Sequence, residues 1–97
     1  MPPKPFDLTE PLAAAIRVLL FSEWDPCSVK LNAGCATEYD DYIPLIYGMA
    51  KKGESVVEIA ARLNFIERSC MSLAPRKELN RAIAKRIVAL AKAENKR

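Results

Sequence analysis

The last quarter of the chain carries the pattern that most restricts its fold, a helical repeat of apolar and basic residues. At about 100° per residue, four apolar side chains fall within an arc of about 80°: Leu79, Ile83, Ile87 and Leu90. Five cations lie within about 100° on the opposite side: Lys77, Arg81, Lys85, Lys92 and Lys96. Pro75 suits the first turn of such a helix. We therefore predict an amphipathic helix with its apolar side on a core and its basic side in solvent.

An earlier helix is predicted before Pro26, because apolar residues recur there at helical spacing. These residues are Leu12, Ile16, Leu19 and Leu20. Either an Asp7–Glu10 capping box or Thr9 followed by Pro11 can begin this helix. Since proline disfavours the helical conformation of the residue before it, we expect the helix to end near Trp24.

A second helix is predicted to begin at Thr37, whose side chain can cap it. Its apolar stripe consists of Tyr39, Tyr42, Ile43, Ile46 and Ala50. Pro44 lies inside this pattern, so we expect the helix to kink or restart there. The segment Lys51-Lys52-Gly53 has the cations and the glycine typical of a helix C-terminus. The preceding residues 25–36 show no periodicity and are predicted to form a loop.

Ser55 and Glu58 have the spacing of a capping box and predict the start of a third helix. The apolar positions of that helix are Ile59, Leu63, Ile66 and Cys70. Short connections after the second and third helices favour antiparallel neighbours. The sequence therefore predicts an all-α fold, with about four helices in a roughly antiparallel bundle. Residues 7–97 would form this single domain, preceded by a disordered or extended arm at residues 1–6.

The composition is that of an ordinary globular domain, with 51% hydrophobic and 28% charged residues. No apolar run is long enough to cross a bilayer, and the N-terminus lacks a signal-peptide pattern, so we expect a soluble cytoplasmic protein without a membrane partner. Three cysteines and no histidine argue against a disulfide framework and a zinc site. We predict no metal and no cofactor, and the sequence leaves open whether Cys27 and Cys35 bridge.

Charge is divided unevenly along the chain. Residues 1–50 hold three cations and seven acids, a balance of −4, whereas residues 51–97 hold twelve cations and five acids, a balance of +7. The two halves therefore either pack on one another or offer a basic face to an acidic partner.

Two short segments combine acids with large aromatic residues. They are Glu23-Trp24-Asp25, before Pro26, and Glu38-Tyr39-Asp40-Asp41-Tyr42, before Pro44. Acids at helix starts can act as caps while aromatic rings anchor the core, or both kinds of residue can form a partner-binding surface. Converging carboxylates could instead perform acid–base chemistry or hold a divalent cation. Since no histidine or glycine-rich phosphate loop accompanies them, we predict no catalytic residue and favour a structural or partner-binding motif.

Residues 56–75 also fit a helix-turn-helix template, which makes DNA binding the alternative function. In this interpretation Asn64 forms the turn, and the apolar positions of the recognition helix are Phe65, Cys70 and Leu73. The nucleic-acid face would comprise Arg68, Lys77, Arg81 and Lys85. One uninterrupted helix from 56 to 71 explains the same apolar positions without a turn, so both arrangements stay open.

The order of these motifs resembles a family of short bacterial helical proteins with the pattern WDP … EYDxYxP … IExxxMxL. Here the pattern reads Trp24-Asp25-Pro26, then residues 38–44, then Ile66-Glu67 with Met71 and Leu73. The resemblance covers roughly residues 12–75 and implies a small cytoplasmic helical protein without a known cofactor or catalytic residue. Some similar proteins look like immunity or antitoxin partners. We therefore predict a non-enzymatic protein–protein interaction module whose partner is another protein and whose oligomeric state is open.

Overall fold

The computed structural model describes residues 8–25 and 39–95, and every regular element within these ranges is helical. The elements are α1 (Pro11–Leu19), η1 (Leu20–Trp24), η4 (Asp40–Tyr42), α2 (Ile43–Lys51), α3 (Val56–Phe65), η5 (Ile66–Cys70) and α4 (Lys77–Asn95). The predicted all-α fold is confirmed. The predictions for the arm at 1–6, for Thr37, Glu38 and Lys96, and for Cys27 and Cys35 lie outside the described residues.

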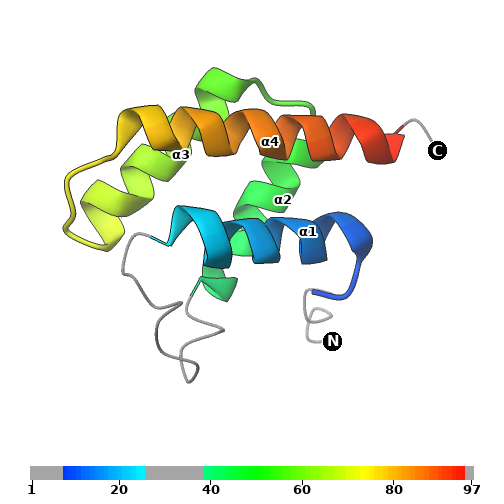
Figure 1. Cartoon of the computed structure of the whole chain (residues 1–97), viewed down its shortest axis with the longest axis horizontal. Helices are drawn as coiled ribbons and strands as arrows, with labels where there is room; N and C mark the ends of the chain where they lie inside the picture. Colours follow the sequence, from blue (N-terminus) through cyan, green and yellow to red (C-terminus); the bar gives the residue numbers. More distant parts are fainter. Residues whose placement is uncertain (1–7, 26–38, 96–97) are drawn as a thin grey trace, which may run out of the picture.

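The helices α1 and α4 lie side by side and run in opposite directions, and α2 crosses between them in the view of Figure 1. Helix α4 packs most extensively on α3 and also contacts α1 and α2. Both α4 and α2 touch each of the other three α-helices.

Helix α1 begins with a cap that the sequence interpretation did not assign. The Glu10 carboxylate accepts a hydrogen bond from the backbone N–H of Ala13 at 3.1 Å, and Pro11 occupies the first turn. Of the two predicted starts the one at Pro11 is therefore observed, with Glu10 as its cap in place of Thr9, whereas Asp7 lies outside the described residues. The helix then widens into the π-helical turn η1 and ends at Trp24, as predicted from Pro26.

Helix α2 shows the predicted restart at Pro44. A short 3-10 turn, η4, leads into an α-helix that begins at Ile43, so Pro44 stands in the first turn, where its missing N–H costs nothing. At the other end Gly53 has a φ of +77°, the left-handed conformation expected of a glycine after a helix.

Helix α3 begins with the predicted capping box. Ser55 Oγ accepts from the Glu58 N–H at 3.2 Å, and the Glu58 carboxylate accepts from the Ser55 N–H at 3.1 Å. The helix continues through Asn64 into the π-helical turn η5 without a break. The turn that a helix-turn-helix requires at Asn64 is therefore absent, and of the two arrangements that the sequence left open the uninterrupted helix is the one observed, from Val56 to Cys70.

Three further predictions need correction. Phe65 and Leu73, expected to be buried, are 43% and 37% exposed. Cys70, a free thiol, is also exposed, because Glu67 takes the last inward position of η5. Pro75 precedes α4 rather than entering it: the Arg76 carbonyl accepts the first backbone hydrogen bond, from the Asn80 N–H.

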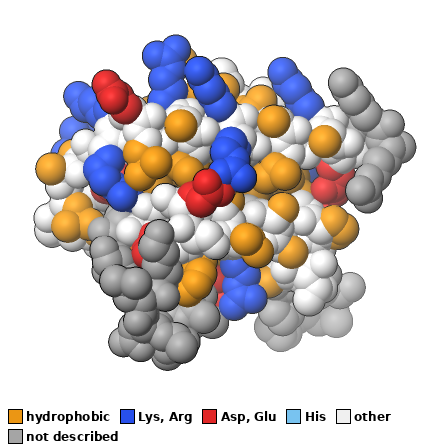
Figure 2. Space-filling model, in the orientation of Figure 1, with side chains coloured by type: hydrophobic (Ala, Val, Ile, Leu, Met, Phe, Trp, Pro, Cys, Tyr) orange, Lys and Arg blue, Asp and Glu red, His pale blue; other side chains and the backbone are white. Residues whose placement is uncertain are grey.

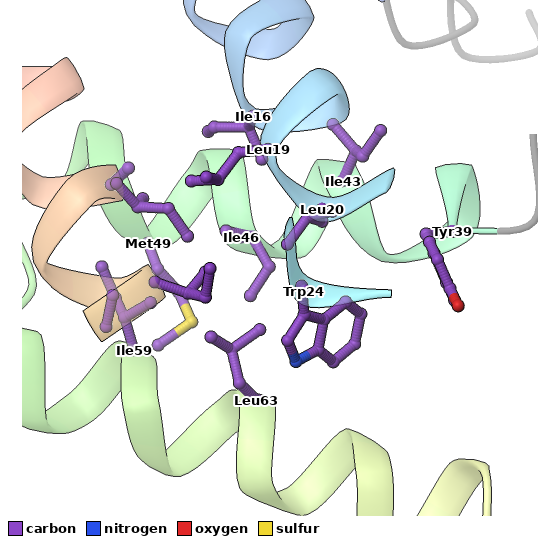
Figure 3. Packing of buried hydrophobic residues seen from close by; sticks show 14 of the residues in the cluster. Ile16, Leu19, Leu20, Trp24, Tyr39, Ile43, Ile46, Met49, Ile59 and Leu63 are labelled. Atoms are coloured by element: carbon purple, nitrogen blue, oxygen red, sulfur yellow. The ribbon is translucent and has the colours of Figure 1, made fainter. Parts of the chain in front are cut away.

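The core lies where α1, α2, α3 and α4 meet (Figure 3). Figure 3 shows labelled apolar side chains of α1, α2 and α3 pointing toward one another, with the indole of Trp24 among them and Tyr39 at the edge. The predicted inward residues of α4 are buried (Ile83, Ile87) or half-buried (Leu79, Leu90), and its described cations are exposed: Lys77, Arg81, Lys85 and Lys92. The amphipathic pattern of the sequence thus sets the orientation of α4.

Candidate functional site: an acidic–aromatic clamp and an apolar groove

Three residues of the acidic–aromatic segments meet inside the protein, and we call Trp24, Asp25 and Tyr39 the clamp. Tyr39 donates a hydrogen bond of 2.6 Å from its hydroxyl to Asp25 Oδ1. The rings of Trp24 and Tyr39 lie 5.4 Å apart between centroids, tilted by 60°. Trp24 is 0% exposed, Tyr39 2% and Asp25 7%. The clamp thus links Asp25 directly to Tyr39, 14 positions later in the chain.

The backbone of Asp25 is shaped for this contact. Its φ of 30° and ψ of 60° are left-handed, and its N–H donates to the Leu20 carbonyl at 2.9 Å. Aspartate tolerates this conformation better than most residues with a Cβ. Asp25 therefore ends the first helical segment and turns its carboxylate toward Tyr39 at the same time.

A second set of polar side chains holds Trp24 from the other side, and we call Trp24, Asn64, Glu67, Arg76 and Asn80 the Trp24 network. The indole N–H donates to Asn80 Oδ1 at 2.9 Å, and Asn80 Nδ2 donates to Glu67 and, at 2.7 Å, to Asn64 Oδ1. Arg76 connects Glu67 back to Trp24: its Nε donates to Glu67 Oε2 at 3.0 Å, and its Nη2 donates to the Trp24 carbonyl at 2.6 Å. Glu67 and Asn80 are fully buried, so these bonds compensate for lost hydration.

The sequence interpretation missed the Trp24 network apart from Trp24 itself. One signal was present: at about 100° per residue, Asn80 falls only about 20° outside the apolar arc of α4, beside Ile87. A polar residue at such a position requires a buried partner. Nothing in the spacing indicated that the partner would be the tryptophan of a distant segment.

The other predicted site residues that the structure describes are more exposed than the clamp. Glu23 pairs with Arg86 of α4, and Asp40 pairs with Arg17 of α1 at 2.9 Å. Asp41 is exposed, and Tyr42 packs edge-on against Trp24 at 6.5 Å between ring centroids. Among the described residues, no group of three or more acids or cysteines is arranged to hold a metal ion.

An apolar hollow runs along the α1–α4 pair, and we call it the α1–α4 groove. Its larger part has a volume of about 530 Å³ and is lined chiefly by Ala15, Val18, Leu19, Ala89, Leu90 and Ala93. A smaller part of about 200 Å³ continues it toward Pro11 and Glu94. Val18 is 65% exposed on its rim. Figure 2 shows hydrophobic side chains along the α1–α4 groove, with charged side chains at intervals beside it.

The end of the groove near Glu94 is acidic. Desolvation raises the pKa of Glu10, but its hydrogen bonds outweigh this effect, so the pKa is lowered overall; they involve the backbone N–H of Ala13, the side chain of Glu94, the backbone N–H of Leu12 and the side chain of Tyr47. Two carboxyl groups, from α4 and from the cap of α1, therefore lie together at this end. At the other end Glu23 and Arg86 balance each other.

The nucleic-acid face of the alternative interpretation is a line of exposed cations without a recognition helix. Lys77, Arg81 and Lys85 are exposed on α4, and Arg68 is exposed on η5. No helix in the described ranges is long and apolar enough to span a membrane. The chain matches no family model, no curated protein and no solved structure with which it was compared.

Proposed function

We propose that the chain is a small non-enzymatic module that binds another protein through the α1–α4 groove. The observation that carries this proposal is the difference in exposure between the clamp and the α1–α4 groove. The clamp residues are buried and bonded to one another, whereas the groove is open, apolar and rimmed by an exposed valine. Open apolar hollows with polar rims are typical of protein interaction sites.

The chemistry of the groove restricts the kind of partner that fits. Its walls are two antiparallel helices with small residues at Ala15, Ala89 and Ala93, which leave room for large side chains from an incoming helix. The neighbouring carboxyl groups of Glu10 and Glu94 favour a basic residue at one end of that helix. The proposed partner is therefore a protein with an amphipathic helix that carries large apolar residues and a terminal lysine or arginine.

The resemblance of the acidic–aromatic motifs to those of other proteins extends the proposal to the organism class, the compartment and the kind of partnership. Short bacterial proteins with the same acidic–aromatic pattern lead us to propose a bacterial cytoplasmic protein that works as an immunity-like or antitoxin-like partner. In such a pair the clamp would keep the first helical segment in place while the groove receives the partner.

Site-specific photo-crosslinking tests the binding proposal. A photoreactive phenylalanine analogue at the exposed position Ala93 should crosslink to a partner protein in the native cells. The crosslink should disappear with Val18→Glu, which places a charge on the groove, and persist with Val57→Glu. Val57 is a matched control because it is 69% exposed on α3, against 65% for Val18, and does not line the groove. Crosslinks that survive Val18→Glu, or none at all, would contradict the proposal.

DNA binding is the second candidate, and the observation in its favour is the exposed line of cations on α4. It predicts a mobility shift with duplex DNA that weakens steeply with salt, because phosphate contacts release counterions. The pair Arg81→Glu and Lys85→Glu should then abolish the shift. If no shift occurs at low salt, this candidate is excluded.

A further inference from the structure

Glu67 places a carboxyl group inside the Trp24 network, and the proposed function makes no use of it. Its side chain is 1% exposed and accepts a hydrogen bond of 3.0 Å from Arg76 Nε. The Arg76 side chain is 40% exposed, so one partner of this ion pair is enclosed and the other reaches solvent. The pair can therefore open by a movement of the cation alone.

The hydrogen bonds of the Trp24 network have a fixed direction. An indole N–H can donate but not accept, so its contact of 2.9 Å with Asn80 turns the amide oxygen of Asn80 toward Trp24. The amide nitrogen of Asn80 then faces Glu67 Oε1, and the guanidinium of Arg76 faces Glu67 Oε2. Both oxygens of Glu67 thus accept from donors. This arrangement suits a carboxylate, and it offers a proton on Glu67 no acceptor among these partners.

The attraction that holds Arg76 in place comes from Glu67. The other neighbours of Glu67 in the network, on α3, α4 and η1, are two asparagines and the tryptophan, which carry no charge. The cations nearest in sequence, Arg68 and Lys77, are exposed and make no ion pair within the described part of the chain. The charge of the buried carboxylate is therefore balanced by Arg76, and this attraction is lost when Glu67 takes up a proton.

Arg76 also holds the connection between η5 and α4 against the end of η1. Residues 71–76 form this connection, in which only Met71 and Pro75 are half-buried and the others are exposed. Its backbone is left-handed at Ser72, with a φ of 56°. At its end the guanidinium of Arg76 donates to the Trp24 carbonyl at 2.6 Å. Release of Arg76 therefore breaks a bond between this connection and η1.

We propose that Glu67 and Arg76 form an acid-sensitive latch. Proton uptake by Glu67 releases Arg76 to solvent and loosens residues 71–76 and the end of η1, while the helical core stays folded. The core persists because its apolar contacts between α1, α2, α3 and α4 do not involve this ion pair, and exposed segments with few apolar contacts open first. The latch goes beyond the proposed function, since it needs no partner protein.

The indole of Trp24 reports the latch directly, because it is the only tryptophan of the chain. The experiment lowers the pH of the full chain from about 7 to about 3, the range in which carboxyl groups take up protons. Trp24 emission should move to longer wavelength and its quenching by acrylamide should rise in one step. Circular dichroism should show unchanged helix content across that step. No step, or a loss of helix in the same step, overturns the latch.

Two substitutions of buried carboxyl groups assign the step to a residue. Glu67→Gln removes the group that takes up the proton, so the acid step should disappear. Asp25→Asn is the matched control, because Asp25 is the other buried acid of the described residues and lies beside Trp24. The step should persist in Asp25→Asn. A step that persists in Glu67→Gln, or one that Asp25→Asn abolishes, overturns the latch.

Arg76→Ala tests the latch without replacing a buried side chain. It removes the cation, so at pH 7 the indole should already show the acrylamide quenching that the parent chain reaches in acid. Quenching equal to that of the parent at pH 7 overturns the latch, and this holds even if Glu67→Gln fails to fold. All of these results concern the free chain. Crosslinks from Ala93 to another protein, on which the proposed function is judged, stand or fall separately.

Discussion

Asn80 lies fully buried on α4 and holds the indole N–H of Trp24, yet its position in the sequence is 56 residues away. Helical spacing predicts that a residue faces inward, but it does not predict which distant side chain will complete its hydrogen bonds. The same limit applies to Glu67 and Arg76, whose roles depend on how η5 and α4 meet. The sequence indicated the inward residues well because burial is a local property of a helix face.

Arg76 is the partner of Glu67 that most directly tests the Trp24 network. Arg76→Ala removes both the bond to the buried carboxylate and the bond to the Trp24 carbonyl. We expect it to lower the free energy of unfolding by roughly 2–3 kcal/mol, less than for a fully enclosed pair. The expected loss is smaller than for a fully enclosed ion pair because the Arg76 side chain is 40% exposed. Urea denaturation at pH 7 measures this change.

The neighbouring Lys77→Ala serves as the matched control for Arg76→Ala. Lys77 is exposed and makes no ion pair within the described ranges, so its loss should change the stability by less than about 0.5 kcal/mol. Equal effects of the two substitutions would show that the network contributes nothing beyond an ordinary surface cation.

At the scale of single helices, the boundaries were predictable where a cap or a proline marks them. Ser55 with Glu58, Pro44 and Gly53 each act within one turn of their own position, and each prediction is confirmed. The π-helical turns η1 and η5 were not predicted, because the apolar spacing of a π-helical turn is hard to distinguish from that of an α-helix. Both turns contribute a residue to the Trp24 network: η1 contributes Trp24 and η5 contributes Glu67.

Gly48 inside α2 and Gly53 just after it should respond oppositely to the same substitution. Gly48 lies in the helix interior with open space around its Cβ position, so Gly48→Ala should stabilise the protein by about 0.5–1 kcal/mol. Gly53 has a φ of +77°, so Gly53→Ala should destabilise it by about 1 kcal/mol or more. Thermal unfolding of the two variants at low protein concentration gives the comparison. Stabilisation by both substitutions would mean that Gly53 does not need its left-handed conformation.

The capping box of α3 should make part of the stability depend on pH. Hydrogen bonds from the backbone N–H and the side chain of Ser55 lower the pKa of Glu58. A carboxyl group with a lowered folded-state pKa stabilises the protein above its ordinary pKa, and this contribution is lost as the pH falls through the folded value. Glu58→Gln keeps a capping acceptor without the charge. By urea denaturation it should be less stable than the parent at pH 7, and the two should become equally stable once the pH is below the folded-state pKa of Glu58. An unchanged difference at both pH values would contradict this.

At the scale of the whole molecule, the sequence predicted the number and class of the helices but not their contacts. Amphipathic spacing, caps and prolines are local signals, and they indicated four helical segments around one core. The interpretation of Trp24 and Tyr39 as inward anchors came from their size and their neighbouring acids, and both are buried. The Tyr39–Asp25 bond and the α1–α4 groove required the packed structure, because each joins segments that have no periodic relation to each other.

Trp24, Asp25 and Tyr39 are buried, and we expect the clamp that they form to stabilise the fold from inside. The most direct test is the free energy of unfolding of Tyr39→Phe beside Asp41→Asn, measured by urea denaturation. Tyr39→Phe removes only the hydroxyl that donates to buried Asp25 and should cost about 2 kcal/mol, whereas exposed Asp41→Asn should stay within about 0.5 kcal/mol of the parent. Equal, negligible changes for both variants would contradict the claim.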